Sequence, residues 1–84
     1  MTAPKLSVIV PAFNHEAYIV AALHSVLAQT LGDLELIVID DASRDGTWDA
    51  IQSIRDPRLR ALRHEHNQGA HATLNEGLGL ARGD

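Results

Sequence analysis

Two adjacent carboxylates, Asp40 and Asp41, directly follow an apolar run at residues 34–39 and are the side chains best suited to chemistry. The run is rich in β-branched residues, which is typical of a buried strand. Carboxylates accept hydrogen bonds from N–H and O–H donors, so one acid could bind a base or ribose while the other braces the loop. Because neighbours on an extended chain point to opposite sides, we expect only one to face a ligand. The alternative is that both acids cap the following helix.

A second polar loop, at residues 11–16, follows an apolar run at residues 6–10. Phe13 would stack on a flat base in this loop, or it would cover the end of the core. Glu16 would lie near a helix N-terminus, where the helix dipole favours an acid with or without a ligand. Since ligands of parallel α/β sheets bind at the carboxyl ends of the strands, the two loops together predict a nucleotide pocket.

Other polar residues give weaker signals. The loop at residues 67–69 precedes an expected helix and could turn free N–H groups toward an anion. His64 and His66 have a spacing that a metal pair can have, but no third ligand candidate is close, so we expect solvated loop histidines. A solvated basic face is also expected from the cluster Arg55, Arg58, Arg60 and Arg63.

Six elements must position these side chains. The expected strands are residues 6–10, 34–39 and 59–63, and the expected helices are residues 15–30, 47–55 and 69–82. The third strand alternates in polarity and should lie nearer an edge of the sheet. Repeated β-α units predict an α/β fold, a three-layer Rossmann-like βαβαβα arrangement with a parallel sheet.

Caps and apolar stripes refine this pattern. Asn14 could cap the first helix, and Thr47 or Asp45 the second. Gly32 and Asp33 should end the first helix, and Gly83 the third. The stripes expected to face the core are Ile19, Leu23, Val26, Leu27 and Leu31 in the first helix, Trp48, Ile51 and Ile54 in the second, and Ala70, Leu74, Leu78 and Ala81 in the third. Gly77 and Gly79 should weaken the third helix by up to about 1 kcal/mol each relative to alanine.

Length and composition limit the choices further. A chain of 84 residues is one small domain at most, and its net charge of −4 argues against nucleic acid as the main partner. It has no cysteine, which excludes disulfides and thiolate metal sites. No apolar run approaches the ~20 residues of a membrane span. We expect a cytoplasmic protein, with peripheral membrane attachment open through parts of a longer parent protein.

Taken in order, these motifs resemble the amino-terminal half of a family-2 inverting glycosyltransferase of the GT-A fold. The matching segments are residues 6–14, 25–30, 35–47, 67–69, 74–77 and 81–84. Each segment alone is modest, but together and in order they are specific. The resemblance covers essentially the whole chain after Pro4.

The resemblance implies a nucleotide-diphosphate sugar donor of the UDP or dTDP type and direct displacement with inversion at the anomeric carbon. The first nucleotide loop of the family is matched by Pro11, Ala12 and Phe13, with Phe13 near the base. Glu16 matches an acid that borders the same pocket, and Asp41 matches the base- or ribose-binding aspartate. Asp40 then has a structural role. Further matches are Asp45, Gly46 and Thr47 in the turn before the second helix, and Asn75, which packs near the site on the third helix.

The resemblance also says what lies outside the chain. A D-x-D motif after Asp84 would hold Mg²⁺ or Mn²⁺, which neutralises the leaving diphosphate, and the catalytic base would lie further on. Residues 1–84 would then be a partial nucleotide-sugar-binding domain that is truncated before the metal motif and inactive alone. Leu74 stands where some relatives carry an arginine, so a contact of that arginine is not expected. An exposed sheet edge would favour self-association.

Two other classes of protein remain open from the sequence. A non-catalytic nucleotide-binding or scaffold module could keep the same fold without transferring a sugar. A phosphoacceptor receiver domain would also carry paired acids after a strand, but it needs a further aspartate at the end of the third strand, where Arg63 and His64 stand.

Overall fold

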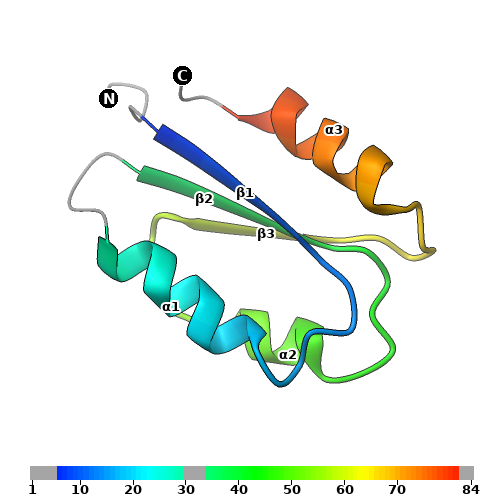
Figure 1. The fold of residues 1–84 in the computed structure, drawn as a ribbon, viewed down its shortest axis with the longest axis horizontal. Helices are drawn as coiled ribbons and strands as arrows, with labels where there is room; N and C mark the ends of the chain where they lie inside the picture. The colour runs from blue at the N-terminus through cyan, green and yellow to red at the C-terminus, as the bar shows by residue number, and fades with distance from the viewer. Residues whose placement is uncertain (1–5, 30–33, 82–84) are drawn as a thin grey trace.

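The computed structural model describes residues 6–29 and 34–81. The elements in chain order are β1 (Leu6–Ala12), α1 (Ile19–Gln29), β2 (Leu34–Asp40), α2 (Thr47–Gln52), β3 (Leu59–Arg63) and α3 (Ala70–Leu80). Helices α1 and α2 lie on one face of the sheet and α3 lies on the other (Figure 1). The predicted three-layer α/β arrangement is confirmed.

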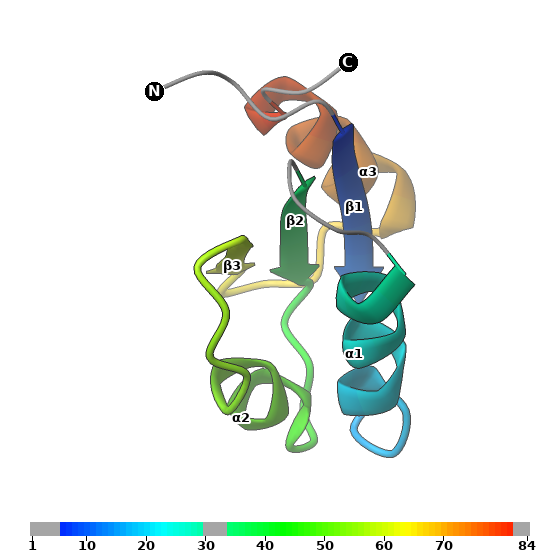
Figure 2. The same ribbon diagram turned by 90° about the vertical axis from the view of Figure 1, so that its left-hand side faces the viewer.

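The sheet is parallel and its spatial order is β1-β2-β3. Its register places Ala12 beside Asp40, and Asp40 beside Arg63, so the carboxyl ends of all three strands meet. β3 pairs with β2 and is only partly buried, as its alternating polarity predicts. α3 turns back from β3 and packs on β1 and β2 (Figure 2).

The core on the α1/α2 face follows the predicted stripes of the first two helices. β2 is buried along its whole length because helices cover both of its faces. The buried cluster on the α1/α2 face consists of Ala12, Ile19, Leu23, Leu36, Val38 and Ile51, and Val26, Leu27, Trp48 and Ile54 pack against it. Leu31 lies outside the described residues.

The predicted inward face of the third helix is wrong. Leu74 and Leu78 are 40% and 59% exposed, whereas Thr73 and Gly77 are buried against the sheet. A Cβ at Gly77 would overlap Cγ2 of Ile9, so the helix backbone approaches the sheet more closely than any side chain would allow. The apolar pattern failed here because small residues, and not large ones, form this contact.

The boundaries and caps also differ from the sequence prediction. α1 begins at Ile19, not near residue 15, and Asn14 does not cap it, because Asn14 Oδ1 accepts the N–H of Arg44 at 2.9 Å. Gly46 stands at the N-cap of α2, and Asp45 Oδ1 accepts the N–H of Thr47 at 3.0 Å. The predicted helix ends at Gly32, Asp33 and Gly83 lie outside the described residues.

A buried acid joins the three strands at the end of the sheet opposite the loops discussed above. Glu35 is 1% exposed, accepts the hydroxyl of Ser7 at 2.9 Å and pairs with Nη1 of Arg60 at 2.6 Å. Arg58 pairs with Asp56 at 2.9 Å. The predicted solvated face is therefore correct in part: the Arg60 side chain is 40% exposed, but Arg58 and Arg60 also pair with acids.

Within the described residues, no helix has both the length and the apolar character that crossing a lipid bilayer requires.

Candidate functional site

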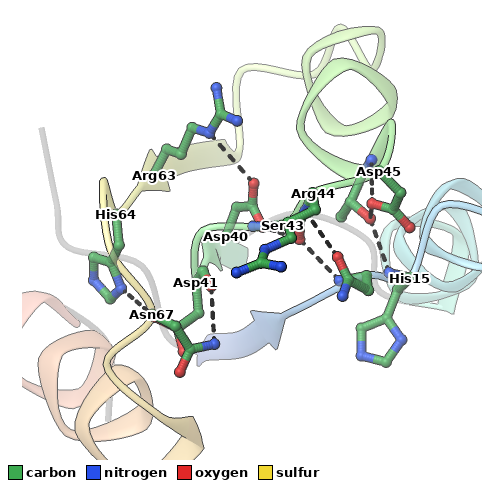
Figure 3. A network of polar contacts seen from close by, with 11 residues as sticks. His15, Asp40, Asp41, Ser43, Arg44, Asp45, Arg63, His64 and Asn67 are labelled. Carbon is green, nitrogen blue, oxygen red and sulfur yellow. Dashed lines mark hydrogen bonds and ion pairs between the residues drawn. The ribbon is translucent and has the colours of Figure 1, made fainter.

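Asp40 and Asp41 point to opposite faces of the sheet, as the alternation of an extended chain predicts. Asp40 points to the α1/α2 side and is fully buried. Its Oδ1 accepts the N–H of Ser43 at 3.2 Å and also the Ser43 hydroxyl, while its Oδ2 lies 3.7 Å from Nε of Arg63 (Figure 3). The Arg63 guanidinium also lies 5.8 Å from the centre of the Trp48 ring. These contacts agree with a structural role for Asp40.

Asp41 points to the α3 side and binds the loop that precedes α3. Oδ1 accepts the N–H of Gln68 at 2.7 Å, and Oδ2 accepts the N–H of Gly69 at 2.8 Å. The anion that faces this loop is therefore the chain's own carboxylate. Gly69 has φ +92°, a conformation that side chains disfavour, which explains a glycine here. Burial opposes ionisation of Asp41, but the hydrogen bonds from His64, Gln68 and Gly69 outweigh it and lower its pKa.

His64 is buried between two acids, so the prediction of a solvated histidine is wrong for this residue. Nδ1 lies 2.8 Å from Oδ1 of Asp41, and Nε2 lies 2.5 Å from Oε1 of Glu76 in α3. The hydrogen bond with Asp41 raises the pKa of His64 most, burial opposes it, and Glu76 raises it further. His66, its partner in the predicted pair, is exposed.

The loop after β1 is held on the loop after β2 by alternate side chains. Three successive backbone N–H groups, those of Asn14, His15 and Glu16, donate respectively to Ser43 Oγ at 2.9 Å, Thr47 Oγ1 at 2.8 Å and Asp45 Oδ2 at 3.2 Å. We call this set of contacts the loop zipper. Reasoning from the sequence considered Asp45 and Thr47 only as helix caps or turn residues and missed these contacts, because no spacing in the sequence indicates which backbone N–H groups of another loop such side chains accept.

Glu16 completes the loop zipper from the other side. Its Oε1 accepts the N–H of Gly46 at 2.8 Å, and a Cβ on Gly46 would meet the Glu16 carboxylate at about 3 Å. The residue lies in the turn before α1, so it is not in the first turn of the helix as predicted.

Two adjoining cavities open where these loops meet. The smaller has a volume of about 260 Å³, and its lining includes four of the predicted nucleotide-binding residues, Pro11, Ala12, Phe13 and Asp41. The larger, of about 890 Å³, is lined in part by Phe13, Asn67 and two arginines, Arg44 and Arg63. Phe13 is 41% exposed and belongs to both cavities. The fold therefore brings the ring and the acid to one open pocket.

Two predicted residues do not line these cavities. Glu16 has its carboxylate in the loop zipper. Asn75 is exposed on α3 and is likewise absent from both linings.

The described residues do not fit a metal ion. Nowhere in residues 6–29 and 34–81 do three or more His, Cys, Asp or Glu side chains gather in a way that could hold one. His64 has two carboxylate neighbours, but both of its ring nitrogens already face those carboxylates.

A family model described as Glycosyl transferase family 2 matches residues 7–84. The chain belongs to this family. Among proteins similar to this family-2 chain is the UDP-Glc:α-D-GlcNAc-diphosphoundecaprenol β-1,3-glucosyltransferase of Escherichia coli, which is 37% identical over 78 residues. The matched segment covers 93% of this chain and 31% of that protein, so the chain spans less than a third of the relative's length.

Solved structures show the same fold in longer glycosyltransferases. S. aureus TarS 1–349 in complex with UDP-GlcNAc matches with a TM-score of 0.86 and 35% identity over 94% of this chain and 24% of that chain. A mannosyltransferase from Pyrobaculum calidifontis in complex with GDP-Man and Mn²⁺ matches with a TM-score of 0.80 and 29% identity, over 96% and 25% respectively. The family-2 chain therefore has the Rossmann-like α/β fold of GT-A glycosyltransferases, as expected.

Proposed function

We propose that this chain supplies the nucleotide pocket of an inverting glycosyltransferase that uses a nucleotide-diphosphate sugar. The observation that carries the proposal is the pocket at the carboxyl ends of β1 and β2, where Phe13 and Asp41 line one open cavity. Ligands of parallel α/β sheets bind at such strand ends. The matched structures that contain UDP-GlcNAc and GDP-Man support a nucleotide sugar as the kind of ligand.

Asp41 is suited to accept a hydrogen bond from a base. A carboxylate oxygen has two lone pairs. Oδ1 already has the N–H of Gln68 and the ring of His64 as partners, whereas Oδ2 has the N–H of Gly69, which leaves a lone pair for one further donor. The imide N–H of a uracil or thymine ring is such a donor, and so is the N1–H of guanine, so the UDP- or dTDP-type donor sugar rests on the family resemblance and the titration below distinguishes it from a GDP-type donor. The half-exposed ring of Phe13 would stack on the base, with Pro11 and Ala12 forming the pocket wall.

Glu16 contributes to the proposed pocket from a distance. Its bond to Gly46 fixes the loop that carries Phe13, so it would border the nucleotide site without lining the smaller cavity.

The transfer reaction needs groups that the described residues do not supply. We propose that Mg²⁺ or Mn²⁺, held by residues beyond Asp84, neutralises the leaving diphosphate, and that a base outside this chain deprotonates the acceptor hydroxyl. Mn²⁺ in the matched mannosyltransferase structure supports a divalent ion of this kind. Residues 1–84 would accordingly be a partial nucleotide-sugar-binding domain.

Binding measurements test the pocket. Titration of the chain with UDP, dTDP and GDP should give saturable binding for at least one of them. Asp41→Ala should weaken that binding by about tenfold or more, because hydrogen bonds to charged groups are worth about 1.5–3 kcal/mol. Phe13→Ala tests the same pocket without removing a buried group. Asp49→Ala, which changes an exposed acid on α2, is the matched control and should bind like wild type.

Equal nucleotide binding by wild type, Asp41→Ala and Phe13→Ala would refute the proposed pocket. A separate assay addresses catalysis. The 84-residue chain should not transfer sugar from a UDP-sugar with either metal present, and metal-dependent transfer by the chain would refute its proposed inactivity.

The name of the E. coli relative points to an acceptor carried on undecaprenol diphosphate. We propose a cytoplasmic enzyme that works at the membrane surface on an acceptor of that kind. A parent protein that transfers equally well to free sugars and to undecaprenol-diphosphate-linked sugars would contradict this proposal.

A further inference from the structure

His64 connects three elements at the edge of the proposed nucleotide pocket. It follows β3, its backbone N–H donates to the carbonyl of Asp40 at 2.9 Å, and its ring lies between Asp41 and Glu76. The side chain is 7% exposed, whereas that of Glu76 is 43% exposed. The ring therefore fixes a buried carboxylate on one side and reaches a half-exposed one on the other.

The charged groups around the ring are few among the described residues. β2 contributes Asp41, since Asp40 points to the other face. α3 contributes Glu76. The neighbours of His64 in its own loop, Glu65 and His66, are exposed, and β1 has no titratable side chain. Two acids thus contact the imidazole directly, whereas Arg44 and Arg63 line the same cavity as His64 and Arg63 pairs with Asp40.

This arrangement needs a particular protonation state. An imidazolium has two N–H donors and satisfies both acids, whereas neutral imidazole has one N–H and would turn a lone pair toward the other carboxylate. In the Nε2–H tautomer the neutral ring donates to Glu76 and Oδ1 of Asp41 loses this donor, so the donor set of Asp41 depends on the proton carried by His64. If that donor is lost, the carboxylate is held only by the two N–H groups of Gln68 and Gly69.

Building on the proposed function, we propose that His64 is a positioning residue that holds Asp41 in the orientation that accepts the nucleobase, and that Glu76 keeps His64 doubly protonated for this purpose. His64 and Gln68 occupy Oδ1, so the free lone pair of the carboxylate is confined to Oδ2. The raised pKa of His64 agrees with the two contacts. The residue touches Asp41 and not the reacting atoms, so its effect is on nucleotide affinity.

A pH profile of affinity tests the proposal. For whichever of UDP, dTDP and GDP binds wild type most tightly, affinity should fall about fivefold to tenfold as pH rises through the pKa of His64, because one charge-assisted contact is lost. His64→Asn keeps a donor near the Nδ1 position but does not titrate, so its affinity should stay within about twofold of wild type at low pH and remain flat. His64→Phe should bind about tenfold more weakly at every pH.

Two further variants make the profile specific. Glu76→Gln should move the midpoint of the profile to lower pH, because it removes one of the two charges that hold the proton. His71→Asn changes an exposed histidine on α3 and should reproduce the wild-type profile. A His64→Asn profile identical to that of wild type, with the same midpoint, would overturn the positioning role.

A measurement without nucleotide tests the coupling between His64 and Asp41 independently of whether the pocket binds a nucleotide. Nitrogen NMR of the imidazole follows the protonation of His64 directly. Asp41→Asn and Glu76→Gln should each lower its midpoint, and an unchanged midpoint in Asp41→Asn would refute the coupling. If no nucleotide binds wild type, the proposed function fails even where this coupling holds. If a nucleotide binds wild type and Phe13→Ala weakens it but His64→Phe does not, the pocket stands and the positioning role fails.

Discussion

Asp40 and Asp41 have the same chemistry but different surroundings. Asp40 lies among the side chains that join β2 to α2, and its Oδ1 orients the Ser43 hydroxyl. Asp41 receives two backbone N–H groups and an imidazole and still lines an open cavity. What separates a structural acid from a candidate ligand-binding acid is therefore the face of the strand on which each lies.

Stability should depend on pH in a direction set by His64. A group whose pKa is raised by folding contributes stability that is complete below its unfolded value of 6.5 and is lost as pH rises through the folded value. The free energy of unfolding of wild type should therefore exceed that of His64→Asn by about 1 kcal/mol near pH 6, and this difference should shrink at higher pH. Urea unfolding of both proteins at several pH values measures this difference.

Asp41 affects stability at acidic pH, whereas His64 affects it near and above neutral pH. Folding lowers the pKa of Asp41, so its contribution to stability is present above the unfolded-state value of 3.8 and is lost as pH falls through the folded value. Wild type should lose stability in acid more steeply than Asp41→Asn. A constant difference between these two proteins across the acid range would contradict the contacts described for Asp41.

At the scale of elements, α3 packs closely on β1. Gly77 allows this contact because a methyl group there would overlap Ile9. Thr73, one turn earlier, is also buried and donates its hydroxyl to the carbonyl of Gly69 at 2.8 Å. The helix is thus held close to the sheet directly above the loop that binds Asp41.

Gly77→Ala should destabilise the chain by about 1–3 kcal/mol, although alanine is the better helix former, because overpacking forces α3 away from β1. A Cβ at Gly79 would meet nothing within 4 Å apart from the surrounding turns of its own helix, so Gly79→Ala serves as the matched control. It should stabilise the helix by up to about 1 kcal/mol. Thermal unfolding of the two variants compares them, and equal shifts of the same sign would contradict the described packing.

The elements that sequence predicts well are those with large, regularly spaced apolar side chains. β2 and the inward stripes of α1 and α2 follow from such spacing, and so does the position of Asp41 at a strand end. The inward face of α3 could not be predicted this way, because the residues that contact the sheet, Thr73 and Gly77, are small and do not form an apolar stripe. The buried state of His64 also depends on Glu76, an acid 12 residues away that only the turn of α3 brings close.

At the scale of the whole molecule, the sheet has unprotected edges. β1 pairs only with β2 among the described strands, and Val8, Ile9 and Val10 are partly exposed. Unpaired backbone groups at such an edge are a template for another chain. The 84-residue chain should therefore self-associate as a dimer or larger species.

Sedimentation measures this association directly. The average mass should rise with protein concentration, since pairing between edges is bimolecular. A single monomeric species at high concentration would rule it out.

The loop zipper has a practical consequence for redesign. The backbone N–H groups after β1 donate to hydroxyl and carboxylate oxygens of Ser43, Asp45 and Thr47, so these three side chains fix the backbone conformation next to Phe13. A mutant library intended to change nucleobase preference should therefore randomise Ala12 and Phe13 and keep Ser43, Asp45 and Thr47 unchanged.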